Sequence, residues 1–362
     1  MLSHKDTTYF RKTYSKASEK FFKPSTTVVK EIIQRSKISR SVIDNEPLNI
    51  HFLNGYWSFT DNKFHVRSDV HYVTKVIGYN LDLDLLQHNT VTIDDISRAL
   101  ALPFSSSNAF NYFVYGVALS MKNIPANNFF VLLGKGGNGK TTFTSILRTV
   151  FEHYCVCLPS VSLDSITDAN KSVECIHSDT LFVFIDEIRA KATKKSSLLK
   201  KLSDGYLMYN RLYQSGSFEM STRAKLVINS NSPLSFDDDD EAIRNRVLYW
   251  KFDKRFSKSP AIPVDNVSVF PAVDNLSVSL SSAQKSAIFL YFALHAERLD
   301  ISIHYPIPSD ILTKNQLVNW KDFVDQHFEL RKNSYVTSDL VFRLFKESYP
   351  DFDYTSRDII KV

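Results

Sequence analysis

One stretch, LLGKGGNGKTTF at residues 132–143, constrains the fold of this chain more than any other. It fits the pattern G-x-x-x-x-G-K-[ST] and carries four of the chain's nine glycines. The apolar run FFVLL comes directly before it and is typical of a buried strand. An apolar stripe at helical spacing follows it, formed by Phe143, Ile146, Leu147, Val150 and Phe151. A strand, a glycine loop and a helix N-terminus together predict a loop that binds phosphate groups.

The ligand contacts follow from the geometry of such a loop. Glycines let successive backbone N–H groups turn inward around a polyphosphate, and the dipole of the helix end favours negative charge. Lys140 would reach the β and γ phosphates, and Thr141 would ligate Mg²⁺. The alternative is a glycine-rich turn that binds nothing, but the strand, glycines, lysine, threonine and helix all agree. We predict a nucleoside triphosphate and Mg²⁺ as ligands, with the triphosphate contacted by Gly134, Lys135, Gly136, Gly137, Asn138, Gly139, Lys140, Thr141 and Thr142.

A second buried apolar run, LFVFIDEI at residues 181–188, ends in two acids. The carboxyl ends of parallel strands gather at one edge of a sheet, so Asp186 and Glu187 are expected beside the glycine loop. Asp186 would hold the hydrated Mg²⁺, and Glu187 would polarise the water that attacks the γ phosphate. An acid pair at the end of a strand is common by chance, and its meaning depends on the glycine loop that precedes it.

The third run, AKLVINSNSP at residues 224–233, delivers two amides, Asn229 and Asn231, at the end of a strand. A neutral amide can hold the attacking water or sense the γ phosphate without repelling it. The sequence NSNSP is also typical of a turn. A turn and a role of these amides at the γ phosphate are compatible.

Two arginines, Arg244 and Arg246, follow the acidic stretch in DDDDEAIRNRVLYWKF at residues 237–252. Four aspartates are usually a solvated loop that caps a helix. An arginine close after the third strand also fits a catalytic role, because a guanidinium stabilises the charge on a transferring phosphoryl group. A neighbouring subunit can supply it.

Composition bounds the class of protein. A length of 362 residues with 43% hydrophobic residues suits two or three domains with packed cores. No apolar run reaches the roughly 18 residues that span a bilayer, and the N-terminus lacks the apolar core of a secretory signal. We therefore expect a soluble, intracellular protein with no membrane partner. The cysteines fit neither a disulfide framework nor a paired zinc motif and are expected to be reduced: Cys155, Cys157 and Cys175.

Basic residues are concentrated at the N-terminus, although the net charge is only +5. The first forty residues carry ten Lys or Arg against three acids, and FRKTYSKASEKFFKPS interleaves aromatic and basic side chains. Such a segment suits contact with a phosphate backbone. A solvated helix face is at least as good an interpretation.

With these motifs in order, the chain resembles the superfamily 3 helicases of viruses and plasmids, and most closely the poxvirus- and phage-type primase-helicase branch. The resemblance covers about residues 127–253. It implies an α/β fold, a P-loop AAA+-like ATPase with a central parallel sheet. It also implies assembly into a homo-oligomeric, hexameric ring. By this resemblance the acid pair is Asp186 and Glu187, the sensor is Asn231 and the arginine finger is Arg246.

Within that resemblance, the sensor and the arginine finger each have two candidate residues. Asn231 is one residue nearer its proline than is usual in the family, so Asn229 stays an alternative sensor. Arg246 is preferred to Arg244 because the family's arginine precedes an apolar run that ends in Phe, as RVLYWKF does.

A hairpin is predicted in DGYLMYNRLYQSGSFEM, residues 204–220, as two short strands around a polar turn. In the family this hairpin points into the central channel of the ring and touches the nucleic acid backbone. Arg211 and Tyr213 are the predicted DNA contacts here. The chain has LSDG where this branch usually carries a glycine-rich tGGD.

The remaining segments flank the ATPase. We predict an N-terminal module of mixed strand and helix at 1–82 and a helical oligomerisation collar at 83–125. The ATPase domain would cover 126–256, and a Ser/Pro/Val-rich linker would cover 257–281. Residues 282–362 look like the helical part of a winged-helix module.

The leading functional hypothesis is an ATP hydrolase that acts as a ring-forming DNA helicase. It would move on single-stranded DNA and unwind replication forks in viral or plasmid replication, in the host cytoplasm or at the replication site, with a primase or origin-binding partner. Primase activity itself is not predicted, because no metal-binding acids of a primase stand out in the first hundred residues. The alternatives are a small-molecule kinase and a non-catalytic nucleotide switch that assembles on DNA.

Overall fold

The structure is a computed structural model. It describes residues 46, 48–67, 73–88, 90–124, 127–163, 173–186, 196–210, 217–234, 236, 241–258, 269–300, 302, 305–313, 323, 327–328 and 335–348. The basic N-terminal segment that was predicted to contact a phosphate backbone lies outside these residues.

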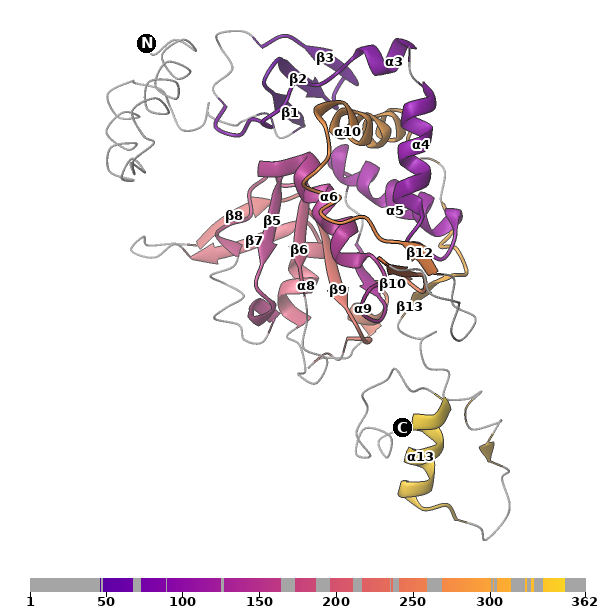
Figure 1. Cartoon of the computed structure of the whole chain (residues 1–362). Coiled ribbons are helices and arrows are strands. Elements are labelled where there is room, and N and C mark those ends of the chain that lie inside the picture. The colour runs from indigo at the N-terminus through magenta and orange to yellow at the C-terminus, as the bar shows by residue number, and fades with distance from the viewer. Residues whose placement is uncertain are drawn as a thin grey trace, which may run out of the picture.

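A six-stranded sheet forms the centre of the described part of the chain (Figure 1). The strand order is β13-β10-β4-β9-β6-β5. Neighbouring strands run parallel except for β13, which pairs antiparallel with β10. The fold is therefore mixed α/β with a mostly parallel sheet. The strands are β4 (Phe129–Leu133), β5 (Cys155–Leu158), β6 (Phe182–Ile185), β9 (Lys225–Ser230), β10 (Val247–Lys251) and β13 (Ile311–Thr313).

Side chains of the central strands alternate between two large hydrophobic clusters, one on each face of the sheet. In β4, Phe130 and Leu132 belong to the first cluster, and Phe129 and Val131 belong to the second. A strand that is buried on both faces must be apolar throughout, which explains the uninterrupted run FFVLL. Helices α5 (Ser107–Met121), α6 (Lys140–Phe151) and α10 (Ser282–Glu297) contribute to the first cluster, and α8 (Ser196–Ser203) contributes to the second.

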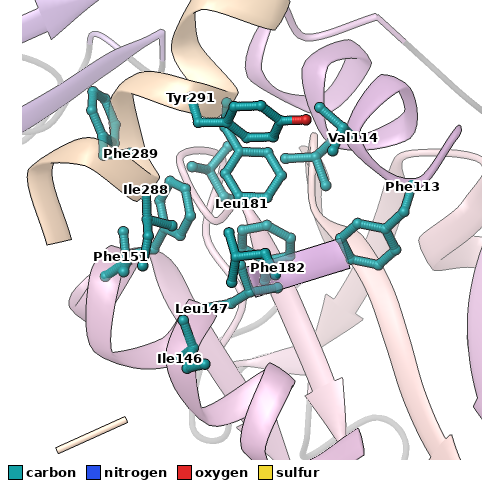
Figure 2. Packing of buried hydrophobic residues seen from close by; sticks show 14 of the residues in the cluster. Phe113, Val114, Ile146, Leu147, Phe151, Leu181, Phe182, Ile288, Phe289 and Tyr291 are labelled. Carbon is teal, nitrogen blue, oxygen red and sulfur yellow. The ribbon is translucent and has the colours of Figure 1, made fainter. Parts of the chain in front are cut away.

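Figure 2 shows how the first cluster joins segments that are far apart in the sequence. The ring centroids of Phe151 in α6 and Phe289 in α10 lie 5.9 Å apart. The same Phe289 ring lies 4.8 Å from Phe52, which belongs to the antiparallel sheet β1 (Asn49–Phe52), β2 (Gly55–Ser58) and β3 (Lys63–His65). Helix α10 thus packs against both the N-terminal strands and α6, although its sequence lies C-terminal to five of the six strands of the central sheet. The predicted domain boundaries stay a prediction.

Local signals explain where α10 begins. The Ser281 side chain accepts a hydrogen bond from the Gln284 backbone N–H, and the Gln284 side chain accepts one from the Ser281 N–H. This reciprocal capping box satisfies two amide groups that a helix N-terminus otherwise leaves unpaired. None of the helices within the described residues is both long enough and apolar enough to span a membrane.

The smaller elements surround this framework. A hairpin of β7 (Tyr206–Asn210) and β8 (Ser217–Ser221) follows α8 in the sequence and precedes β9, and it projects at the left side of the molecule in Figure 1. A parallel ribbon of β11 (Arg255–Ser257) and β12 (Val269–Pro271) follows β10. The other elements are α3 (Asp84–His88), α4 (Thr90–Ala101), η2 (Glu152–Tyr154), η3 (Ser160–Leu163), α9 (Glu241–Arg244) and α13 (Ser338–Ser348).

Candidate functional site

The glycine loop connects β4 to α6 at the carboxyl edge of the sheet. Gly137 and Gly139 have φ values of +78° and +87°, a left-handed conformation that disfavours side chains. Gly134 is required for a different reason, because a Cβ there would lie 1.9 Å from Asn138 Nδ2 and 2.3 Å from the Phe252 carbonyl oxygen. The backbone shape and the close approach of β10 therefore demand the glycines that the motif supplies.

Lys140 is the first residue of α6 and is only 6% exposed. Its Nζ donates to the carbonyl oxygens of Gly134 and Lys135, the latter at 3.2 Å, and to Asn138 Oδ1 at 2.9 Å. Burial lowers the pKa of this ammonium to about 8. A nearby anion would favour the charged form, so the site is electrostatically suited to phosphate.

Asn138 connects the loop to the neighbouring strand. Its Nδ2 donates to the Phe252 carbonyl oxygen at 2.5 Å, and its Oδ1 accepts from Lys140. The side chain is buried and connects the loop to the residue that directly follows β10. Thr141 and Thr142 lie on the first turn of α6 and are exposed, so their hydroxyl groups are available to a ligand.

An acid and an amide meet beside this helix. Asn229 in β9 donates from Nδ2 to Asp186 Oδ1 at 2.6 Å and to Thr144 Oγ1 at 3.1 Å. Strand β9 lies between β4 and β6, so its side chain can bridge the helix that follows β4 and the acid that follows β6. Arg148 Nη1 approaches Asp186 Oδ2 at 3.8 Å from the same helix.

Asn229, rather than Asn231, is therefore the amide that the fold brings to the acid. Asn229 is 4% exposed, and its Oδ1 has no hydrogen-bond partner among the described residues. A buried acceptor without a partner is costly unless water or a ligand donates to it. Asn231 lies beyond the end of β9 and is exposed. Glu187, the second predicted acid, lies outside the described residues.

Thr144 and Arg148 were missed by the sequence motifs. They follow Lys140 at intervals of four residues, so all three side chains share one face of α6. A polar stripe at positions 140, 144 and 148 beside an otherwise apolar helix face is the signal that could have found them.

Arg246 lies at the opposite edge of the sheet from the glycine loop. Its carbonyl oxygen accepts from the Phe129 N–H at 2.8 Å, at the start of β4, whereas the loop follows the end of β4. Five residues of strand separate the two, about 16 Å at 3.3 Å per residue. The Arg246 side chain donates to Asp204 Oδ1 from Nη2 at 2.8 Å and to the Ala242 carbonyl oxygen from Nη1 at 2.9 Å.

The predicted hairpin is present as β7 and β8, with Tyr206 opposite Ser221 and Asn210 opposite Ser217. Arg211 and Tyr213, the predicted DNA contacts, belong to the connecting segment and lie outside the described residues.

Comparisons with known proteins bear on the region that contains this site. A family model described as "Family of unknown function (DUF5906)" matches residues 132–246, which include the glycine loop, Asp186, Asn229 and Arg246. The search of curated proteins gives no match.

Three solved apo structures of the NrS-1 C-terminal region are similar to the chain, with 17%, 18% and 16% sequence identity and TM-scores of 0.39, 0.42 and 0.36. The alignments cover 55–56% of this chain and 44–45% of theirs. The chain thus matches less than half of the length of those chains.

Proposed function

We propose that the chain is an ATP-driven motor of DNA replication, a ring-forming superfamily 3-type helicase of a virus or plasmid. It binds Mg²⁺-ATP in the glycine loop, hydrolyses it and moves on single-stranded DNA to unwind a fork. The observation that carries this proposal is the contact of Asn229 with both Asp186 and Thr144. Three strands there bring a phosphate-type loop, an acid and a neutral amide to one edge of a parallel sheet.

The residues present fit a nucleoside triphosphate. Gly137 and Gly139 give the loop a left-handed backbone at the start of α6, and Asn229 Oδ1 is a buried acceptor without a partner among the described residues. Lys140 would exchange its contacts with loop carbonyl oxygens for phosphate oxygens. Thr141 and Asp186 would hold Mg²⁺, which supplies positive charge to the phosphates when bound.

The water that attacks the γ phosphate needs orientation and a base. We propose that Asn229 positions this water, because its Oδ1 lacks another partner among the described residues and can accept a hydrogen bond from the water. Its Nδ2 stays fixed by Asp186 and Thr144, so the amide is held rigidly. Glu187 takes the proton in this proposal, as the residue directly after Asp186.

The position of Arg246 favours a motor over a small-molecule kinase. This guanidinium is at the far edge of the sheet from its own glycine loop, so it cannot stabilise charge on a phosphate bound there. It can do so only for a neighbouring copy, in a head-to-tail arrangement that closes into a ring. The β7–β8 hairpin, inserted before β9, is the element we assign to the DNA track.

The test is particle imaging of the full chain with a non-hydrolysable ATP analogue and a forked DNA, together with ATPase measurements with and without single-stranded DNA. The proposal requires closed rings on the fork and hydrolysis that DNA stimulates. Monomers with DNA-independent turnover would contradict it. Transfer of phosphate to a small acceptor in the absence of DNA would support the kinase instead.

A further inference from the structure

The segment that follows β10 crosses the glycine loop. The Phe252 carbonyl oxygen accepts a hydrogen bond from Asn138 Nδ2 at 2.5 Å, and the Phe252 N–H donates one to the Leu133 carbonyl oxygen at 2.8 Å. Four residues later the Phe256 N–H donates to the Gly137 carbonyl oxygen at 2.8 Å. Residues 252–256 therefore lie along the outside of the loop and are fixed to it at both ends.

Aromatic rings accompany this crossing. The Cε2 and Cδ2 atoms of Phe256 lie 3.2 and 3.4 Å from the position that a Cβ on Gly139 would occupy, and Pro103 Cβ lies 3.6 Å from the same point. Phe256 is opposite Phe270 in the β11–β12 ribbon, with ring centroids 5.8 Å apart and planes inclined by 35°. Phe256, Phe270 and Pro103 are half-buried, whereas the large side chains of the core are almost fully buried. A partly exposed apolar surface thus borders Gly139, the N-cap of α6.

We propose that Phe256, with Phe270 beside it, is the platform on which the base of the bound nucleoside triphosphate stacks. This inference rests on the proposed function. Phosphates held by the loop amides leave the ribose and base to extend past the helix N-terminus, where these rings lie. Every base has a π-face, and stacking on an aromatic side chain is tolerant of base identity. Stacking strength rises with the size of the ring system, so the site modestly prefers the larger purines to pyrimidines and separates adenine from guanine weakly.

A purely structural role for the ring is the competing explanation. Phe256 could shield Gly139 and brace the loop, in which case its loss would weaken every ligand of the loop equally. Inorganic tripolyphosphate distinguishes the two explanations, because it carries the phosphates without a base.

The experiment measures dissociation constants of the full chain by calorimetry in the presence of Mg²⁺, for a non-hydrolysable ATP analogue, the matching CTP analogue and tripolyphosphate. We expect Phe256→Leu to weaken the ATP analogue about 5- to 150-fold, the range of a lost base stack. Tripolyphosphate should bind as it does to the parent, and Phe256→Tyr should keep parental affinity for the ATP analogue. In Phe256→Trp, the ATP analogue should quench the added fluorescence, and tripolyphosphate should not.

Equal weakening of ATP analogue and tripolyphosphate by Phe256→Leu would overturn the platform and leave a bracing role. If the parent binds the ATP analogue and the CTP analogue with equal affinity, the purine preference is wrong. A change in the affinity for oligo(dT) with unchanged ATP-analogue affinity would assign the ring to DNA instead. If neither the ATP analogue nor tripolyphosphate binds the parent, the proposed function itself fails, which is a separate outcome.

Discussion

Asn229 is the residue at which the glycine-loop helix and the acid strand are connected. Its amide nitrogen donates to both Thr144 and Asp186, and its buried oxygen has no hydrogen-bond partner among the described residues. A fixed dipole directed at a developing charge contributes most to the transition state, because it requires no reorganisation during the reaction. Asn229 should therefore affect turnover more than nucleotide binding.

Replacing this amide is the first test at the residue scale. Asn229→Ala should lower kcat for ATP hydrolysis about 10²- to 10³-fold and change KM little. Asn231→Ala is the matched control two residues further along the chain, and it should stay close to the parent because Asn231 is exposed and beyond β9. Steady-state ATPase assays measure both. The opposite ranking would return the sensor role to Asn231.

Lys140 gives the second prediction at this scale. In Lys140→Met the buried ammonium is lost while the volume of the side chain is roughly kept, so the loop should fold and bind ATP poorly. Hydrolysis should fall to background. Lys258→Met is the control, since Lys258 makes an exposed pair with Asp274 and should hydrolyse ATP normally. Normal turnover by Lys140→Met would sink the assignment of the phosphate loop.

At the scale of elements, hydrophobic periodicity was sufficient to predict the strand, loop and helix around the glycines. FFVLL became β4 and the stripe from Phe143 to Phe151 became the buried face of α6. The choice between two asparagines two residues apart was beyond such patterns. It depends on where β9 ends and which neighbours flank it, and strand order is set by non-local pairing that a single sequence does not state.

Strand β9 also begins with an unusual residue. Lys225 is 3% exposed, and its Nζ donates to the Asn128 carbonyl oxygen and to Asn128 Oδ1 at 3.2 and 3.1 Å. Burial lowers its pKa from 10.5 to about 7, which corresponds to about 5 kcal/mol against the charged form. The Phe130 ring face, 4.8 Å from Nζ, favours the ammonium by about 2 kcal/mol, which is less than the cost of burial, so desolvation dominates.

This gives a pH prediction for the element. Between pH 7 and 9 the unfolded chain holds the Lys225 proton and the folded chain releases it, so the free energy of unfolding rises with pH, by up to about 1.4 kcal/mol per pH unit. Below the folded pKa of about 7 both states are protonated and this dependence ends. Lys225→Gln should remove most of the rise between pH 7 and 8, measured by urea unfolding at several pH values, because Lys140 adds its own rise only above its folded pKa of about 8. The control variant Lys251→Gln, at the exposed end of β10, should keep the rise of the free energy of unfolding with pH. If Lys225→Gln also keeps it, the buried lysine stays charged in the folded chain.

At the scale of the whole molecule, the two edges of the sheet carry different halves of one proposed site. The glycine loop, Asp186 and Asn229 are at the carboxyl edge, and Arg246 is at the amino edge. Arg246 follows the sensor strand in the sequence but stands directly before β10, and parallel strands all begin at the same edge, so it lies at the amino edge. An arginine that serves catalysis from there must act on another copy.

Subunit mixing tests that arrangement directly. Arg246→Ala removes the finger but keeps a complete glycine loop, and Lys140→Ala removes the loop's lysine but keeps the finger. Each variant alone should be inactive, whereas mixed rings contain interfaces in which an intact loop faces an intact arginine, so part of the ATPase activity should return. The recovery should pass through a maximum as the ratio of the two proteins is varied.

Asp204→Asn, which weakens the pair that holds Arg246 within its own chain, should leave the glycine loop unaffected and serves as a control for local disruption. Mixed assembly without any recovery, established by differently tagged copies that co-purify, would show that Arg246 does not act across a subunit boundary.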